Sequence, residues 1–425
     1  MFKMFGSGRK PKEEKPKQEF HSQELVETLA ENAHPPKINL VFNQMIDSQK
    51  GSNISFSPLT IKKGIHLAAS ACKKDDTYYS DKFGEQFNRD LGLPGDVSYN
   101  EDLMFYILAA GEGCMFPEAV ASRIDFLRKN GVNIFQNASP ADINNFISKL
   151  TNGKMQNVVT LPFLSAVISG LYFKLIWRHQ FDESLTTQGC FYDVNDNATN
   201  AWLMYKKETL LYGFLGDILG PEFEDTRVIR LDGNFIKPNY TAEDVQKLLE
   251  KRKESMGEWD DHFLLDSDEE DYKMRKDGVY VILPGKDKYS SAESKEEYMH
   301  ELSKRVIGLW SDILSSLRPY QVKVTLPRMF LSSKSNLTDI LVNTFPDLFS
   351  KEYNVLGIGG SYTIEHVTFL NLDEKGAEGG ALFVLLTLGN DPMDVFLCNR
   401  PFILAVADEC GEMIFFSLIK YNPQL

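Results

Sequence analysis

The chain has 425 residues, of which 43% are apolar and 25% are charged, and its formal net charge is −14. The apolar fraction is ordinary for a globular protein, and the length alone would suggest two or three domains. The acidic balance argues against nonspecific binding to nucleic acid, and no apolar run approaches the ~20 residues that a membrane helix needs.

Residues 1–20 form a polar stretch rich in Lys, Pro and Gly, which predicts a disordered basic tail. This stretch lacks the apolar core of a secretory signal, so we expect an intracellular protein, with an extracellular one as the alternative. The five cysteines follow no metal-ligand spacing, which predicts free thiols and no metal site. The chain has no HExxH, GxSxG or P-loop motif, so we expect neither an enzyme nor a bound cofactor.

Several segments have the periodicity of helices. Gln23–Ala33 is the first of them. Pro58–Ala71 and Pro140–Leu150 each follow a serine, and serine followed by proline is typical of a helix start. Lys73–Asn88 is polar and predicts a surface helix or a loop.

The next elements are strands. Leu161–Trp177 is a near-continuous apolar run, which predicts a strand that is buried on both faces. Thr226–Leu231 and Val279–Pro284 are further strand candidates. The segment at about 232–278 between them contains an acidic run, Asp260–Asp271. This run has no central glycine of an EF-hand loop, so we interpret it as a solvated spacer or, alternatively, as a site for a basic partner surface.

The stretch before the C-terminus is the most informative one. Gly376–Ala381 is built almost entirely of small residues, Leu382–Leu388 is uncharged and β-prone, and Gly389–Pro392 predicts a turn. Such a stretch is either an ordinary strand, loop and strand, or a loop that can become a strand. An exposed apolar strand promotes aggregation, so a stable protein should either bury this segment or use it.

Motifs from about residue 39 to the C-terminus resemble those of the serpin family, and they occur in the family's order. They include the start of a buried helix, a helix that crosses the main sheet, a central strand with its tryptophan, the hinge of the reactive-centre loop and the C-terminal strands. The matching segments are Asn53–Pro58, Ile143–Met155, Leu171–Asp182, Leu326–Arg328, His366, Asp373–Ala381 and Arg400–Pro423.

The resemblance implies a single α+β domain at residues 21–425, with three β-sheets, about eight to nine helices and an exposed reactive-centre loop at about 374–395. In serpins a short turn joins the two strands that flank residues 232–278, so this segment is read as an acidic hairpin insertion. The implied function is suicide-substrate inhibition of a serine or cysteine endopeptidase. A noninhibitory carrier, chaperone or interaction protein is the alternative. We expect a monomer whose partner is the target protease, with no nucleic acid or membrane partner.

The resemblance also assigns residues to the hinge. The family's register places Ala377, Gly379, Ala381 and Phe383 toward the interior of the sheet after insertion. Phe383 is larger than usual, and Ala377 replaces a more frequent Thr or Ser, which would slow insertion and favour cleavage without inhibition. The hinge residues are Glu374, Gly376, Ala377, Glu378, Gly379, Gly380 and Ala381.

The length of the loop predicts the reactive bond. Glu374 and Pro401 are 27 positions apart, a spacing found in many inhibitory serpins, and this spacing places the bond at Asn390–Asp391. Asparagine at this position indicates an asparaginyl cysteine protease. The second choice, Leu388–Gly389, would suit a chymotrypsin-like or cathepsin-like protease. Cleavage after Asp391 ranks third, because the next residue is proline.

Two further sites follow from the resemblance. Ser57, Thr60, Ser169 and His366 would form the shutter beneath the centre of the main sheet, where the strands must part, and Trp177 would lie in the breach at its top. A buried polar cluster must be hydrogen-bonded, so His366 should contact the Ser57–Thr60 region. Ser169 stands where the family has an asparagine, which predicts a rewired network.

Overall fold

The computed structural model describes residues 35–71, 84–95, 97–99, 103–116, 118–151, 153–236, 276–349, 364–377 and 394–424. All of the described elements belong to one unit, residues 36–425. The predictions for residues 1–20, for Gln23–Ala33 and for most of the insertion lie outside the described residues.

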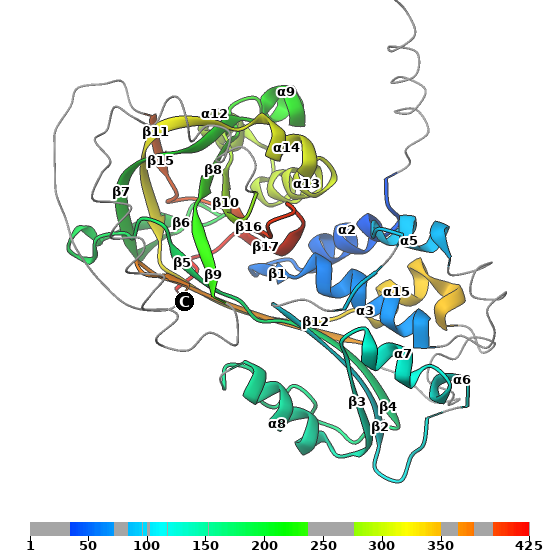
Figure 1. Ribbon diagram of the computed structural model, residues 1–425. Coiled ribbons are helices and arrows are strands. Elements are labelled where there is room, and N and C mark those ends of the chain that lie inside the picture. Colours follow the sequence, from blue (N-terminus) through cyan, green and yellow to red (C-terminus); the bar gives the residue numbers. More distant parts are fainter. Residues whose placement is uncertain are drawn as a thin grey trace, which may run out of the picture. The chain divides into compact units, whose positions relative to one another are not determined.

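Nine strands form the largest sheet, in which distant parts of the sequence pair (Figure 1). Its members β10, β16 and β17 are buried along their whole length, which explains their almost unbroken runs of apolar residues. The order is β1 (Ile54–Phe56), β17 (Met413–Ile419), β16 (Phe402–Ala407), β10 (Gly278–Leu283), β8 (Arg227–Leu231), β7 (Ala198–Phe214), β11 (Arg318–Pro327) and β15 (Asp394–Leu397), and β6 (Thr187–Tyr192) pairs with β7.

The remaining described strands form three short sheets. One has the order β3 (Val132–Ala138), β2 (Met104–Gly111), β4 (Ser165–Leu171); another is β14 (Gly376–Ala377), β5 (Lys174–Trp177), β9 (Gly233–Ile236); the third is the pair β12 (Met329–Asn336) and β13 (Glu365–Leu372). The predicted strand Leu161–Trp177 corresponds to β4 and β5. The prediction that it is buried on both faces is wrong for β4, which is only half-buried over most of its length.

Both helices that were predicted from a serine followed by proline are confirmed. In α3 (Pro58–Ala71), the Oγ of Ser57 accepts a hydrogen bond from the backbone N of Thr60 at 3.3 Å. In α8 (Pro140–Leu150), Ser139 and Asp142 form a reciprocal capping box. These side chains satisfy backbone N–H groups that have no partner inside the helix.

These two helices cover opposite faces of the sheet that contains β2 (Figure 1). Tyr106 and Leu108 of β2 belong to the same apolar cluster as Leu67 of α3. Ile107 belongs to the cluster that contains Ile143 of α8. Alternate side chains of a strand point to opposite faces, so β2 is buried by α3 on one side and by α8 on the other.

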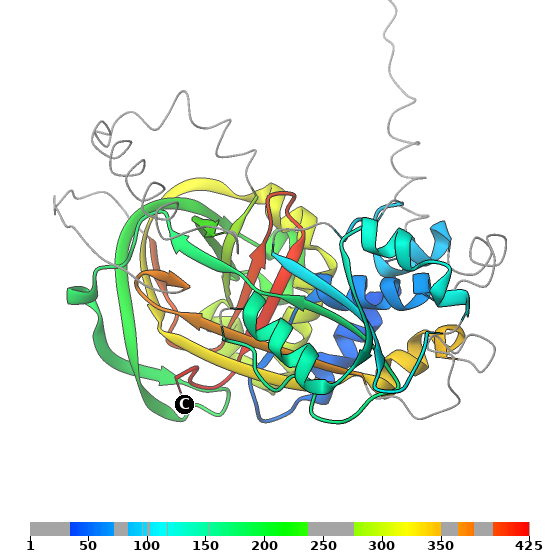
Figure 2. The same ribbon diagram turned by 60° about the horizontal axis from the view of Figure 1, so that its bottom comes forward.

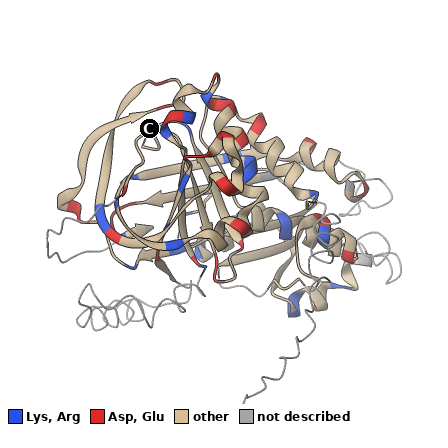
Figure 3. Cartoon of the chain, turned by 90° about the horizontal axis from the view of Figure 1, so that it is seen from above, with Lys and Arg blue, Asp and Glu red and all other residues tan. Residues whose placement is uncertain are grey.

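The other helices contact strands or one another. Among the described residues, no helix is long and apolar enough to cross a membrane. Basic and acidic residues are interspersed on these elements (Figure 3). The helices are α2 (Ile38–Ser48), α5 (Glu85–Leu91), α6 (Glu118–Ala121), α7 (Ile124–Lys129), α9 (Gly216–Leu219), α12 (Lys286–Ser291), α13 (Lys295–Gly308), α14 (Trp310–Ser316) and α15 (Thr338–Thr344), with 3-10 turns at Glu183–Leu185, Pro221–Phe223 and Pro346–Phe349.

Candidate functional site

The chain reverses direction directly after β13. The backbone N of Asp373 donates to the carbonyl of Gly376 at 2.9 Å, and the N of Gly376 donates back to the carbonyl of Asp373 at 3.3 Å. Gly376 has a φ of +133°, a conformation that side chains with a Cβ rarely adopt. The predicted hinge therefore begins with a tight turn that requires glycine.

The two residues after this turn form the strand β14. Gly376 pairs with Ile176 and Ala377 pairs with Leu175, antiparallel to β5. A Cβ on Gly376 would lie 2.2 Å from the carbonyl oxygen of Leu175, so the two backbones approach more closely than any other residue would permit. The first described residues of the predicted hinge after the turn thus pair with β5 as a short strand.

The carboxylate of Glu374 connects the turn to neighbouring parts of the fold. This residue is only 3% exposed. Arg328 donates to it through Nε at 2.8 Å and lies at 2.7 Å through Nη2, and the hydroxyl of Thr186 donates at 2.6 Å. Burial alone would raise the pKa of Glu374, but the hydrogen bonds from Arg328 and Thr186 outweigh it and hold the pKa below its ordinary value.

Trp177 holds the other side of the turn. Its indole Nε1 donates to the carbonyl of Asp373 at 2.9 Å, and its side chain is fully buried. The amino group of Lys206 lies 4.6 Å from the ring centre of Phe181 and 5.9 Å from that of Trp177. Trp177 therefore contacts the turn directly, and its place in a breach stays a prediction.

A cavity of about 340 Å³ lies below β14, between β4 and β13. Leu171 and Tyr172 line one side of it, and Val367 and Phe369 of β13 line the other. Within the described sheets, β4 pairs only with β2 and β13 pairs only with β12 (Figure 2). Among the described strands, the facing edges of β4 and β13 are thus unpaired and lie on either side of a gap, which accounts for the half-buried side chains of β4.

Hydrogen bonds connect both sides of this gap to the start of α3. The Oγ of Ser169 on β4 donates to the carbonyl of Thr60 at 2.7 Å. On the other side, the Nε2 of His366 on β13 accepts from the backbone N of Ser57 at 2.9 Å. The predicted contact of His366 with this region is therefore present, and Ser169 reaches the same helix start from the opposite strand.

The predicted reactive-centre loop leads into β15. A polar cluster holds Asp394, the first residue of this strand. Arg227 donates to the Oδ1 of Asp394 at 3.0 Å, and the hydroxyl of Tyr212 donates to its Oδ2. Burial, followed by the hydrogen bond to Asp394, raises the pKa of Tyr212, so this hydroxyl remains a donor. The part of the loop between Ala377 and Asp394 has fixed points at both ends.

The remaining predicted loop residues lie outside the described part of the chain. These are the hinge residues Glu378, Gly379, Gly380 and Ala381 and the residues of the two candidate reactive bonds, Leu388, Gly389, Asn390 and Asp391. The roles of Arg328 and Thr186 were missed from the sequence. No local signal in the sequence pairs Arg328 with Glu374, because each residue alone reads as an ordinary surface charge.

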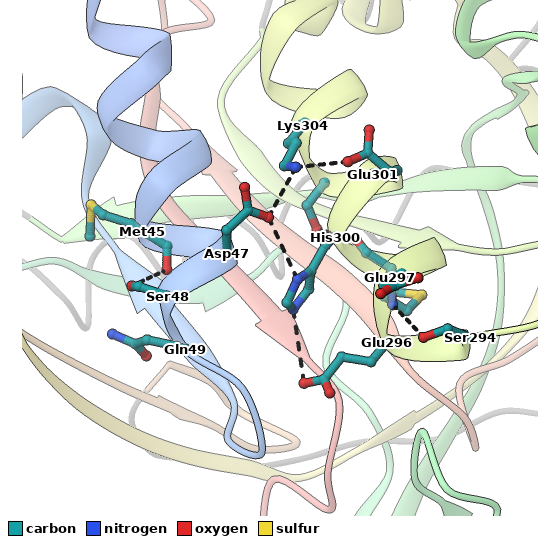
Figure 4. A network of polar contacts seen from close by, with 12 residues as sticks. Met45, Asp47, Ser48, Gln49, Ser294, Glu296, Glu297, His300, Glu301 and Lys304 are labelled. Atoms are coloured by element: carbon teal, nitrogen blue, oxygen red, sulfur yellow. Dashed lines mark hydrogen bonds and ion pairs between the residues drawn. The ribbon is translucent and has the colours of Figure 1, made fainter. Parts of the chain in front are cut away.

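Buried histidines make the stability of the fold depend on pH. Loss of hydration lowers the pKa of His66 to about 4 and has the same effect on His366. Burial and the nearby Lys420 also lower the pKa of His300, which lies in a network of ion pairs between α2 and α13 (Figure 4). Because the unfolded chain binds protons near pH 6.5 and the folded chain does not, stability is present above that pH and is lost as pH falls toward 4.

We expect the urea concentration at the midpoint of unfolding to decrease as the pH is lowered from 7 to 5. His66, which is 8% exposed, should alone account for about 2 kcal/mol of the free energy of unfolding lost over this interval. In the variant His66→Asn the slope against pH should be smaller, because asparagine does not titrate. Equal slopes in both proteins would contradict this assignment, and the exposed replacement Lys334→Gln serves as the control.

Comparison with known proteins identifies a family. A family model described as serpin (serine protease inhibitor) matches residues 129–269 and 233–419. An uncharacterised serpin-like protein of Thermococcus kodakarensis is 22% identical, with 94% of this chain and 88% of the relative covered. Serine proteinase inhibitor 1 of vaccinia virus is also 22% identical, over 90% of this chain and 99% of the relative.

Solved structures share the fold. Human thyroxine-binding globulin superposes with a TM-score of 0.61 at 15% identity, over 92% of this chain and 98% of the other. At this level of identity the likeness concerns the fold alone.

Proposed function

Because this chain belongs to the serpin family, whose members are mostly protease inhibitors rather than catalytic enzymes, we propose that it is a suicide-substrate inhibitor of a serine or cysteine endopeptidase. One observation carries the proposal. The start of the predicted hinge turns and pairs with β5 at the upper end of the gap between β4 and β13.

The proposed reaction begins with attack of the protease on the loop between Ala377 and Asp394. The nucleophile forms an acyl-enzyme with the new C-terminal residue of the loop, and the leaving amine remains on the segment that ends in β15. The freed hinge then continues from β14 down the gap as a strand antiparallel to β13, and it carries the protease with it. Ser169 and His366 must move apart for this step, since they hold the two sides of the gap.

The free energy for this movement comes from completing the sheet. A segment of about 15 residues at ~3.3 Å per residue spans roughly 50 Å. At ~1 kcal/mol net for each hydrogen bond, with apolar burial in addition, its insertion supplies roughly 10 kcal/mol or more. Such a gain is large enough to deform a captured protease before the acyl bond is hydrolysed.

We further propose Asn390–Asp391 as the reactive bond and Leu388–Gly389 as the second choice. The first would make an asparaginyl cysteine protease the target, and the second a chymotrypsin-like or cathepsin-like one. We also propose that the protein acts as a monomer, since one chain supplies both the loop and the gap. The noninhibitory alternative would require that the loop is cleaved without insertion, or is not cleaved at all.

The test is to incubate the protein with proteases of these classes and to analyse the products on a denaturing gel. We expect a covalent complex and a released C-terminal peptide that starts at Asp391 by mass spectrometry. The cleaved protein should melt about 10 °C higher than the intact one, the shift expected for roughly 10 kcal/mol in a chain of this size. Cleavage without a complex and without a rise in melting temperature would reject inhibition in favour of the noninhibitory alternative.

A further inference from the structure

The strand β9 is the first part of the insertion, and the sequence did not predict it. It follows β8 after a single residue, Asp232, and pairs antiparallel with β5. The order of this small sheet is β14, β5, β9, so the hinge and the insertion hold opposite edges of the same strand. The strand β2 pairs with β4 only as far as Leu171, below β5.

Both neighbours approach β5 through a glycine. On one edge, Gly233 lies opposite Trp177, and a Cβ there would be 2.2 Å from Cδ2 of Leu175 and 3.0 Å from the carbonyl oxygen of Ile176. On the other edge, a Cβ on Gly376 would be 2.2 Å from the carbonyl oxygen of Leu175. Leu175 is fully buried. The spacing on each side of β5 is therefore fixed by the absence of a side chain.

The two ends of β9 are fixed to the core. At its start, the carbonyl of Asp232 accepts from the backbone N of Arg178 at 2.8 Å. The carboxylate of Asp232 lies 2.6 Å from Nε of Arg230, and both side chains are largely buried. Further along, the ring of Phe235 packs edge-on against Phe173 at 5.9 Å. Because Arg230 belongs to β8, these contacts connect β5 to the nine-stranded sheet.

We propose that β9 is a positioning strand for the hinge: its pairing with β5 holds β5 where β14 can pair with the opposite edge, so that insertion segment and hinge bind β5 cooperatively. The physical reason is that a two-stranded ribbon is marginal in water, whereas three strands stabilise one another. A hinge of two residues on an otherwise unpaired β5 would be such a ribbon. This role rests on the proposed function, since it matters only if the hinge continues into the gap.

Hydrogen exchange followed by mass spectrometry on the whole, uncleaved protein tests the coupling without a protease. The backbone N of Arg178 reports on β9, while the N of Trp177, bonded to Lys375, and the N of Gly376 report on the hinge. Two variants release β9, Gly233→Val by collision and Phe235→Ala by loss of packing. Gly308→Val is the control, because a Cβ there meets nothing within 4 Å.

We expect exchange at Arg178, Trp177 and Gly376 to become at least tenfold faster in both variants, while the amides shared by β2 and β4 stay protected. Faster exchange at Arg178 with unchanged exchange at the hinge would overturn the proposal, as would no change at Arg178 in either variant. If Gly233→Val loses protection from exchange throughout the protein, the result for Phe235→Ala decides whether the proposal holds.

The outcome is separate from that of the proposed function. A wild-type protein that never forms a covalent complex rejects inhibition but leaves the exchange result valid. If a complex forms, Phe235→Ala should shift the products at least threefold from complex toward cleaved protein, while Gly308→Val should not. An unchanged product ratio together with a released hinge would also overturn the positioning role.

Discussion

Replacing Gly376 with valine should turn an inhibitor into a substrate. The side chain would collide with β5, since its Cβ alone would lie 2.2 Å from the carbonyl oxygen of Leu175 and 2.8 Å from Cα of Ile176. The backbone at φ +133° adds strain of about 1–3 kcal/mol for a residue with a Cβ. The strand β14 is then lost, and insertion starts more slowly than the acyl bond is hydrolysed.

We expect the ratio of covalent complex to cleaved protein to fall at least tenfold, because each ~1.4 kcal/mol added to the barrier of insertion slows it by that factor. The measurement is quantitative gel analysis at equal amounts of protease. Gly308→Val is the matched control, since it adds the same side chain in open space at the end of α13. Inhibition of Gly376→Val at the wild-type ratio would show that β14 has no part in the reaction.

The tight turn after β13 agrees with local signals in the sequence, while the hinge role of the residues that follow it stays a prediction. A run of small residues after a strand needs no knowledge of the rest of the fold, and the same is true of Ser139 before Pro140. The end of an apolar run is less well defined. Leu161–Trp177 reads as one strand, but the structure separates β4 from β5 at Tyr172 and Phe173, and the gap beside β4 leaves that strand half-buried.

Pairing between segments that lie far apart in the sequence could not be predicted from local patterns. The strand β9 has four residues, and what makes it a strand is its partner β5, nearly sixty positions earlier in the chain. The ion pair of Arg328 with Glu374 is of the same kind, because each residue alone reads as an ordinary surface charge. Family resemblance supplied the order of the motifs, but it implies only a short turn where β9 lies, so β9 could not be predicted from it.

Breaking the ion pair between Arg328 and Glu374 should strongly lower the stability of the uncleaved protein. In Arg328→Ala, the carboxylate of Glu374 stays buried with Thr186 as its remaining described side-chain donor. Breaking a buried pair in this way costs about 3–5 kcal/mol, and we expect the lower end, because Arg328 itself is 39% exposed. The urea midpoint and the melting temperature of the uncleaved protein should both fall.

A double-mutant cycle separates the pair from the loss of either side chain. Glu374→Gln removes the charge that needs Arg328, so the double variant should be less destabilised than the sum of the two single variants by at least 1 kcal/mol. As a control, Arg305→Ala breaks an exposed pair with Glu222 and should cost no more than about 1 kcal/mol. Additive losses in the cycle would mean that Arg328 stabilises the protein by packing alone. A coupled loss would instead identify the buried carboxylate as the group that fixes the turn from which the hinge must enter the sheet.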